Sequence, residues 1–171
     1  MSDAWHGKLV AVDATGWNWV QIQAWIEQQN RMESLDVVFI DYIQECRVNG
    51  MVKEYDAVTY VMKQLKPLAH RLDLVTVALA QIKRDPDQGG ASREPRISEI
   101  RNSGQIEQAA DVIEILYLPR DENSGSIKPE TMQVRMAKVR NARSGIAASL
   151  VWNNECQELL SRDGEGYTEY N

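Results

Sequence analysis

The fold is decided by an apolar stretch that ends in a carboxylate, Leu35-Asp36-Val37-Val38-Phe39-Ile40-Asp41. Its β-branched and aromatic residues favour a strand, and the near absence of polar alternation is typical of a parallel strand covered on both faces. Asp41 follows directly, at the end of the strand where α/β sheets bind their ligands. We therefore expect a buried strand over 37–41 with Asp41 at its carboxyl end.

Strands and helices are expected to alternate on both sides of this stretch. Helical spacing of apolar residues predicts helices over 17–32 and 53–72, and Pro67 predicts a kink or an early end of the second helix. Further apolar stretches predict strands over 8–12, 74–80 and 111–118, the last two buried, and the more alternating segments 131–139 and 146–152 predict a pair of edge strands. The pattern indicates an α/β fold, with a mostly parallel twisted sheet flanked by helices and antiparallel strands at its C-terminal edge.

Length and composition predict a single domain. A chain of 171 residues with 43% apolar composition can bury one core, which we place within 1–161, and 162–171 is expected to be a flexible tail. A long exposed loop is predicted over 83–95, where charged residues, Gly and Pro gather.

Charge and cysteine content narrow the classes of function. The chain has 25 acidic and 19 basic residues, which argues against a broadly basic surface, so any contact with phosphates must be local. Cys46 and Cys156 form no Cys-x-x-Cys pair and indicate a reducing cytoplasm. No apolar run approaches the roughly 18 residues of a membrane span, so no membrane association is predicted.

Two strand ends carry candidate nucleotide-binding residues. Asp41 could hold Mg²⁺ through water while the metal bridges nucleotide phosphates, although a strand-end carboxylate can equally cap a turn. Gln81 ends the next strand and could reach the same crevice to orient a water or respond to a γ-phosphate, although it could also be a polar cap.

Two further segments could bind phosphates. Arg101 and Asn102 precede Gly104 and a short helix, so this turn could contact a phosphate backbone, or it could be an ordinary capped helix start. Lys138 and Arg140 are two residues apart on one strand and share a face, so they could clamp a γ-phosphate, even that of a neighbouring subunit. Two cations on a solvated edge strand are the alternative.

Read in order, four segments resemble the DnaB-type replicative helicases: Phe39-Ile40-Asp41-Tyr42-Ile43-Gln44, Val77-Ala78-Leu79-Ala80-Gln81-Ile82-Lys83-Arg84, Ile100-Arg101-Asn102-Ser103-Gly104-Gln105-Ile106-Glu107-Gln108-Ala109-Ala110-Asp111 and Lys138-Val139-Arg140-Asn141. The third segment is the most specific of the four. The resemblance implies a RecA-like, three-layer motor domain that works as a ring of six, hydrolyses ATP with Mg²⁺ and moves along single-stranded DNA. It also implies a bacterial or phage origin and a primase or a helicase loader as partners.

The resemblance assigns a role to each candidate residue. Asp41 would be the Mg²⁺-associated carboxylate, and Gln81 the sensor that links the nucleotide to the DNA loops. The DNA backbone would be touched by the loop that holds Arg101, Asn102 and Gly104. The pair that reaches a neighbour's nucleotide would be Lys138 and Arg140.

Two features depart from the family pattern. The family usually has Glu where Asn102 stands, and no Gly-x-x-x-x-Gly-Lys-Ser/Thr phosphate-binding loop occurs anywhere in the chain. We therefore expect an N-terminally truncated motor domain that alone binds no nucleotide and is inactive. The alternatives are a fragment of a RadA-like recombination ATPase, or a non-enzymatic RecA-like module that holds DNA or caps a helicase ring.

Overall fold

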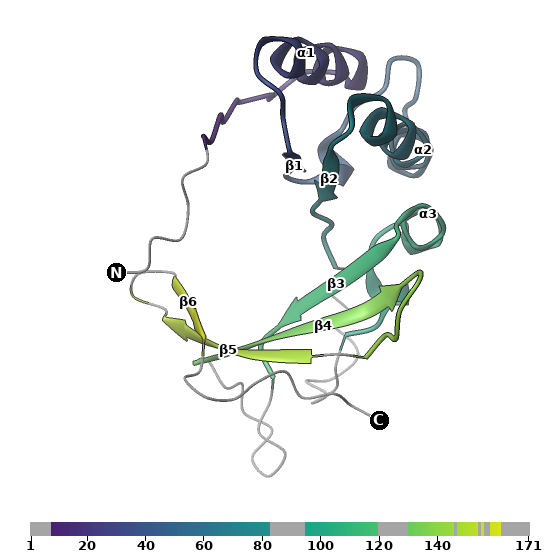
Figure 1. Ribbon diagram of the computed structural model, residues 1–171. Coiled ribbons are helices and arrows are strands. Elements are labelled where there is room, and N and C mark those ends of the chain that lie inside the picture. The colour runs from purple at the N-terminus through teal and green to yellow at the C-terminus, as the bar shows by residue number, and fades with distance from the viewer. Residues whose placement is uncertain are drawn as a thin grey trace.

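The computed structural model describes residues 8–82, 95–119, 130–145, 147–153, 155 and 158–161. They form a helical part that carries a small parallel sheet, and a separate antiparallel sheet (Figure 1). Residues 83–94 of the loop expected over 83–95, and the tail expected over 162–171, lie outside the described residues.

Helix α1 (Trp19–Met32) begins where its first turn is capped by two reciprocal hydrogen bonds. Asn18 Oδ1 accepts a hydrogen bond from the Gln21 backbone N–H (3.1 Å), and Gln21 Oε1 accepts one from the Asn18 N–H (2.9 Å). This capping box satisfies N–H groups that a helix start otherwise leaves unpaired. The helix predicted over 17–32 is confirmed, with a start two residues later.

Helix α2 (Glu54–Leu72) supplies the centre of the core. It continues through Pro67, so the early end that this proline predicted was wrong. The helix ends at Asp73, whose φ of 53° is left-handed. Its buried residues recur at spacings of three and four positions, so they form one stripe: Ala57, Val58, Val61, Met62, Leu65 and Leu68.

The parallel sheet consists of β1 (Val37–Ile40) and β2 (Val75–Ala78), joined in register from Val37↔Val75 to Ile40↔Ala78. One face packs against the core, where Ile40 is buried. The other face is exposed: Phe39 is 65% and Val75 is 58% accessible. Both strands were predicted to be covered on both faces, and this was wrong because the helices of the described residues pack on one face only (Figure 1).

The antiparallel sheet has the order β3-β4-β5-β6. Its strands are β3 (Val112–Tyr117), β4 (Thr131–Val139), β5 (Ala147–Asn153) and β6 (Glu158–Ser161). The predicted pairing of the segments 131–139 and 146–152 is confirmed, but these strands lie inside the sheet, and β3 and β6 form its edges.

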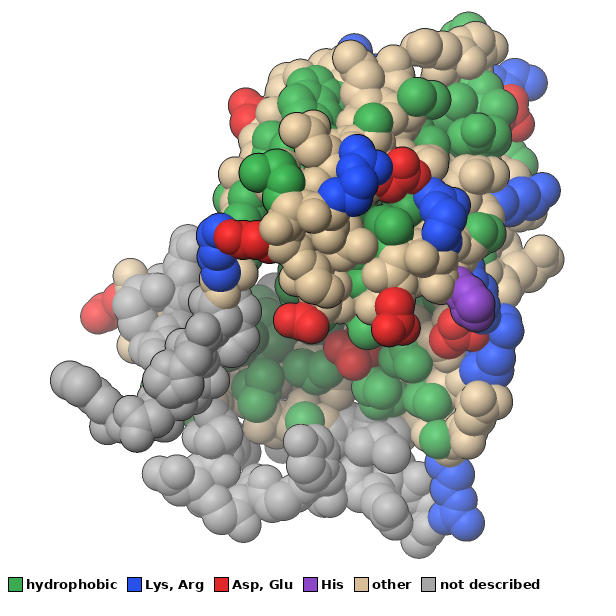
Figure 2. Space-filling model, turned by 45° about the horizontal axis from the view of Figure 1, so that its top comes forward, with side chains coloured by type: hydrophobic (Ala, Val, Ile, Leu, Met, Phe, Trp, Pro, Cys, Tyr) green, Lys and Arg blue, Asp and Glu red, His purple; other side chains and the backbone are tan. Residues whose placement is uncertain are grey.

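The predicted layout, a mostly parallel sheet with antiparallel strands at its C-terminal edge, is only partly matched. Within the described residues only β1 and β2 pair in parallel, and β3 joins β4 in the antiparallel sheet. Only alternate residues of β3, Ile113 and Ile115, are buried, so β3 is not the fully buried strand expected over 111–118. Hydrophobic side chains gather in a hollow near the middle of one face of the molecule (Figure 2).

The short strand predicted over 8–12 is absent, because these residues run as an extended segment without a partner strand in the described chain. Leu9, Val10 and Val12 are all exposed there. The segment is tied to the end of α1 by an ion pair between Lys8 and Glu33, with 2.5 Å between nitrogen and oxygen. Among the described helices, none is both long and apolar enough to cross a membrane.

Candidate nucleotide and DNA site

The ends of β1 and β2 lie side by side, as their sequence predicts. The Leu79 N–H donates to the Ile40 carbonyl, and the Ile43 N–H donates to the Leu79 carbonyl, both over 2.9 Å. Asp41 is exposed at this edge, and the peptide bond between it and Tyr42 is cis. Gln81, also exposed, lies two residues beyond Leu79. The structure therefore brings the segments that contain Asp41 and Gln81 together at the carboxyl end of the parallel sheet.

A buried amide, Gln44, connects this edge to the loop that precedes α3 (Ser103–Ala109). Only 9% of Gln44 is exposed. Its Oε1 accepts from the Gln81 N–H (3.3 Å), and its Nε2 donates to the Arg101 carbonyl (3.5 Å). The Arg101 N–H in turn donates to the Gln81 carbonyl (3.2 Å). These three bonds form a closed triangle, so the backbone at Gln81 and the backbone at Arg101 are joined both directly and through the Gln44 side chain.

The predicted DNA loop rests on the first turn of α2. The Arg101 guanidinium lies 3.7 Å from a carboxylate oxygen of Glu54, and the Asn102 side chain donates to the other oxygen of that carboxylate (3.0 Å). Asn102 has a left-handed φ of 60°, a conformation that Asn tolerates better than most residues. A Glu at position 102 would place two carboxylates in contact, which gives a local reason for Asn here.

Gly104 lies in the first turn of α3, because the helix begins at Ser103, so the predicted position of Gly104 in the loop before the helix was wrong. Gly104 is exposed, and a Cβ added there would meet nothing within 4 Å apart from its chain neighbours and the backbone of its own helix. The backbone at this position is therefore open on its outer side. The next residue, Gln105, is anchored to α2, since its side-chain amide donates to the Tyr55 hydroxyl (3.3 Å).

Lys138 and Arg140 converge on the segment between α3 and β3. The Lys138 ammonium donates to the carbonyls of Ala110 (2.8 Å) and Glu107, near the negative end of the α3 dipole. The Arg140 side chain pairs with Asp111 (3.0 Å) and lies 3.4 Å from the Gln108 carbonyl. The shared face predicted for this pair is therefore observed, and in this structure both cations are held by groups of their own chain.

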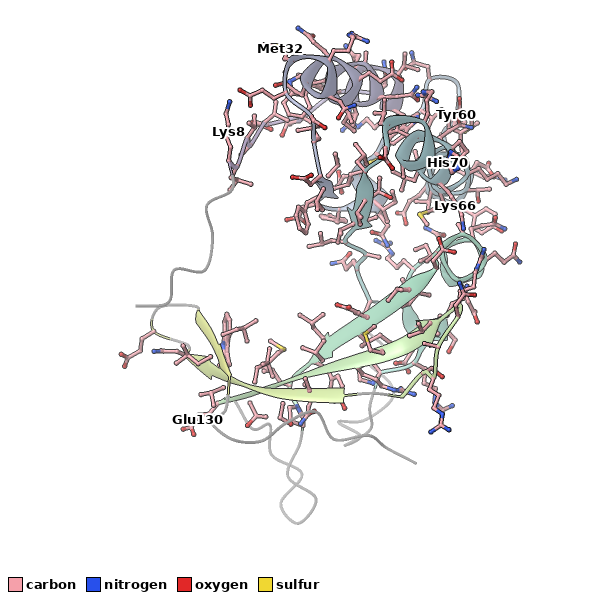
Figure 3. The ribbon with its side chains drawn as sticks, viewed as in Figure 1. Lys8, Met32, Tyr60, Lys66, His70 and Glu130 are labelled. Carbon is pink, nitrogen blue, oxygen red and sulfur yellow. The ribbon has the colours of Figure 1, made fainter. Side chains whose placement is uncertain are left out.

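Asp111 joins this cluster to α2. Lys66, on the side of α2 that faces α3, donates to both carboxylate oxygens of Asp111 at 2.7 and 2.8 Å (Figure 3). The hydrogen bond from Lys66 and the nearby charge of Arg140 lower the pKa of Asp111 below the usual carboxyl range. Asp111 therefore stays ionised as the shared anion of two cations.

Helix α3 separates the two phosphate-binding candidates. The loop with Arg101 lies at its N-terminal end, and the carbonyls that hold Lys138 lie at its C-terminal end. Seven residues span about 10 Å at 1.5 Å per residue. The candidate residues thus form two groups linked by one short helix.

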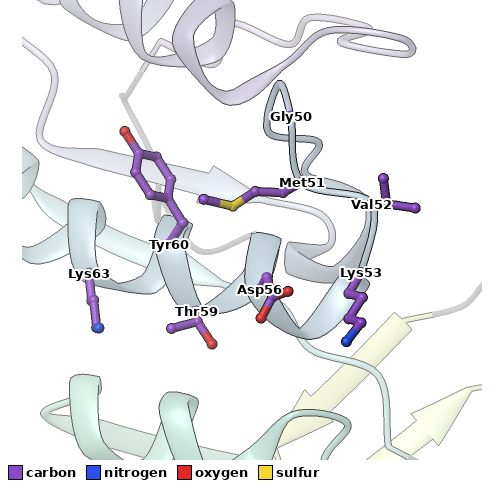
Figure 4. A pocket seen from close by; sticks show the side chains of 8 residues that line it. All are labelled: Gly50, Met51, Val52, Lys53, Asp56, Thr59, Tyr60 and Lys63. Atoms are coloured by element: carbon purple, nitrogen blue, oxygen red, sulfur yellow. The ribbon is translucent and has the colours of Figure 1, made fainter.

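A separate open depression lies on the outer side of α2 (Figure 4). Its volume is about 590 Å³, and its lining consists of Gly50, Met51, Val52, Lys53, Asp56, Thr59, Tyr60 and Lys63. It contains none of the residues that the sequence predicted for the nucleotide or DNA site. Among the described side chains, no group of three or more His, Cys, Asp or Glu residues could hold a metal ion.

Sequence reasoning did not single out Gln44, Glu54 or Asp111 as site residues. One signal could have found Gln44: it is a polar residue shortly after a strand that was predicted to be buried, where a side-chain amide can pair with backbone groups. No such signal marked Glu54 or Asp111, because their partners are distant in sequence. Arg101 and Asn102 lie 47 and 48 positions from Glu54. Arg140 and Lys66 lie 29 and 45 positions from Asp111.

A family model for the DnaB-like helicase C-terminal domain matches residues 2–161. The chain belongs to this DnaB-like family. It is 33% identical to the replicative DNA helicase DnaB of Geobacillus stearothermophilus over 72% of this chain and 28% of that protein. It is also 33% identical to DnaB of Treponema pallidum, over 84% of this chain and 30% of that protein. The chain thus spans about 30% of the length of these relatives.

Solved structures support the same assignment. A solved ATPase domain matches 85% of this chain with a TM-score of 0.72 and 29% sequence identity, and the match covers 52% of that domain. A second solved structure is a DnaB-like replicative helicase, described with its interactions with primase. The match covers 89% of this chain and 37% of that helicase chain, with a TM-score of 0.75 and 30% sequence identity. The resemblance inferred from four sequence segments is confirmed, and the fold is that of part of a helicase ATPase domain.

Proposed function

We propose that this chain forms the DNA-contacting and subunit-contacting part of the motor of a DnaB-type replicative helicase, which moves along single-stranded DNA at the expense of ATP. One observation carries the proposal: the hydrogen bonds of the buried Gln44 join the strand end at Gln81 to the loop at Arg101. A motor needs such a mechanical link, because nucleotide state has to change the position of the groups that hold DNA.

Each candidate residue has a place in this motor. Asp41 offers an exposed carboxylate that fits an outer ligand of Mg²⁺, and Gln81 responds to the nucleotide bound beside it. Arg101 supplies charge to the DNA backbone, together with the Asn102 side chain and the open backbone at Gly104.

The pair Lys138 and Arg140 acts on the nucleotide of a neighbouring subunit in a ring of six. Electrostatics supports this role. Within the part of the chain that the structure describes, Lys138 is held by backbone carbonyls and Arg140 by the exposed Asp111 carboxylate and a carbonyl, all partners that a phosphate can replace. Arg140 would exchange Asp111 for phosphate oxygens. The expected partners are other copies of the chain, single-stranded DNA and, by analogy with the solved helicase described with primase, a primase. A helicase loader stays an expectation from the family resemblance, and the expected location is the cytoplasm of a bacterium or a phage-infected cell.

The chain alone is proposed to hydrolyse no ATP, since its sequence contains no phosphate-binding loop. ATP and Mg²⁺ belong to the complete motor, where the metal neutralises phosphate charge. ATP hydrolysis by the purified chain that disappears in Arg140→Ala would show that the loop is dispensable and would overturn this part of the proposal.

DNA binding is the direct test of the remaining part. Fluorescence anisotropy with a labelled single-stranded oligonucleotide should show binding that weakens with salt, because cations released from phosphates drive it. Arg101→Ala should weaken binding and reduce the salt slope by about 1, as expected for one lost phosphate contact. Arg31→Ala, at the exposed end of α1, is the matched control and should leave binding unchanged. Equal affinity of the two variants would contradict the assignment of the loop.

A further inference from the structure

One carboxylate of α2, that of Glu54, contacts both polar side chains of the loop that precedes α3. Glu54 is the first residue of α2, and its side chain is 40% exposed. One of its oxygens accepts a hydrogen bond from the Asn102 side chain (3.0 Å), and the other lies 3.7 Å from the Arg101 guanidinium. An acidic side chain therefore stands at the loop to which the proposed function gives the contact with DNA phosphates.

The charge of Glu54 is unfavourable for that contact. Binding to DNA depends on cations that neutralise phosphates, and a negative charge beside them opposes it. If Glu54 acted through its charge alone, its removal would tighten the binding of DNA. The contacts of Glu54 support the opposite role.

These two contacts differ in strength. The distance of 3.7 Å to Arg101 exceeds the length of a charge-assisted hydrogen bond, which is about 2.7 to 2.9 Å. Both partners of this ion pair are partly exposed, and such pairs contribute little, so a phosphate can replace Glu54 as the partner of Arg101. The bond from Asn102 has the ordinary length of a hydrogen bond, so the carboxylate chiefly holds Asn102.

Asn102 is the residue at which the chain turns into α3. Its φ of 60° is left-handed, and a residue other than glycine keeps such a conformation where its surroundings hold it. Its side chain makes no capping hydrogen bond to α3, although Asn is among the preferred residues for such a cap. The amide is bound to Glu54 instead, so the loop is held from α2.

We propose that Glu54 is a positioning residue for DNA binding: it holds Asn102, and with it the neighbouring Arg101, in the conformation that meets the phosphate backbone. The inference rests on the proposed function, because it takes the loop at Arg101 as the DNA contact. Gln44 holds the backbone of this loop, whereas Glu54 holds its side chains. Glu54 thus aids the binding of DNA despite its charge.

The first test uses the conflict between charge and position. Fluorescence anisotropy with a labelled single-stranded oligonucleotide compares the parent chain with two Glu54 variants. Glu54→Ala should weaken binding about three- to tenfold, because the hydrogen bond from Asn102 is lost. Glu54→Gln keeps an acceptor for that bond and should bind within about twofold of the parent chain. Both variants lose the same charge at the start of α2, so the difference between them reports the hydrogen bond.

Asp56→Ala is the matched control. Asp56 is another exposed carboxylate in the first turn of α2, but it lines the separate depression (Figure 4). Its replacement removes one negative charge without touching the loop, so binding should stay unchanged or tighten slightly. Circular dichroism of each variant measures whether α2 stays folded.

The second test measures whether Glu54 acts through Asn102. In an Asn102→Ala background the carboxylate has no amide to hold, so Glu54→Ala should then change the affinity less than about twofold. A general loss of stability would weaken binding equally in both backgrounds.

Three results would overturn the inference while Arg101→Ala still weakens binding. The first is binding by Glu54→Ala as tight as that of the parent chain or tighter, which would show that Glu54 acts through its charge. The second is equally weak binding by Glu54→Ala and Glu54→Gln, and the third is an undiminished effect of Glu54→Ala in the Asn102→Ala background. A parent chain that binds no DNA, or no more tightly than Arg101→Ala, would overturn the proposed function and the inference with it.

Discussion

The two faces of the parallel sheet are built from the same two strands and have opposite surroundings. On the covered face, Ile40 packs into the core with Val58 and Leu68 of α2. On the opposite face, which we call the open face, Val37, Phe39, Val75 and Val77 are exposed. Both faces are apolar, so the composition of a strand does not by itself show which of its faces the chain covers.

The comparison separates residues that stabilise this chain from apolar residues that stay exposed in it. Side chains on the covered face are already removed from water and contribute to the free energy of unfolding. Side chains on the open face contribute little until a partner covers them, because transfer from water is what stabilises. Substitutions on the two faces should therefore have very different effects on stability.

The largest effect is expected on the covered side. Leu68→Ala removes a side chain that is 1% exposed, and should lower the free energy of unfolding by about 2 to 5 kcal/mol through lost burial and a cavity. Urea unfolding followed by circular dichroism measures the change. Phe39→Ala is the matched control on the open face and should cost less than about 1 kcal/mol. A cost for Phe39→Ala that matches the cost for Leu68→Ala would show that the open face is already covered.

A smaller effect is expected at the buried amide that links the covered core to the candidate site. Gln44→Ala leaves the Gln81 N–H and the Arg101 carbonyl without their partner, which should cost about 1 to 3 kcal/mol. Hydrogen exchange at Gln81 should accelerate. Glu45→Ala, at the exposed neighbouring position, is the control and should leave that exchange rate unchanged. Unaltered exchange at Gln81 in Gln44→Ala would remove the link on which the proposed motor depends.

The sequence was sufficient to locate most helices and strands and to recognise the family, but not to predict which faces of the parallel sheet are covered. The helical spacing of Val58, Val61 and Leu65 located α2, and the β-branched run Val37 to Ile40 located β1. Both predictions used local periodicity, which one segment carries by itself. The coverage of Phe39 depends on segments far away in sequence, and so an apolar run was read as buried when half of it is exposed.

The same distinction holds for the candidate site. Asp41 and Gln81 were placed at one edge because parallel strands align their carboxyl ends, a rule of topology. The ties of Arg140 to Asp111 and of Asn102 to Glu54 could not be predicted, because they join residues distant in sequence through side-chain geometry. The roles of all these residues in catalysis and DNA binding stay predictions.

The open face should also be visible to a dye. The double substitution Phe39→Ser and Val75→Thr reduces exposed apolar surface, so binding of 8-anilinonaphthalene-1-sulfonate should fall while the free energy of unfolding changes by less than about 1 kcal/mol. Val52→Ser, at the fully exposed position outside the face, is the control and should lower dye fluorescence much less. Equal dye binding by the parent and the double variant would show that the patch is not accessible in solution.

The smallest effect is expected where α2 meets the antiparallel sheet, away from both faces. Lys66→Met removes the hydrogen bonds that chiefly lower the pKa of Asp111, so this pKa should rise toward the ordinary value of about 4. Because the native pKa is lowered, the pair stabilises the fold above the ordinary carboxyl range, and this contribution is lost as pH falls through the native pKa. The variant should show less of this acid-dependent loss. Titration of the Asp111 carboxyl carbon by NMR measures the shift, with Lys63→Met on the exposed side of the same helix as the control. An unchanged titration in Lys66→Met would mean that Lys66 does not lower the pKa of Asp111. The tie between α2 and the cluster of Asp111, Lys138 and Arg140 would then have to be abandoned.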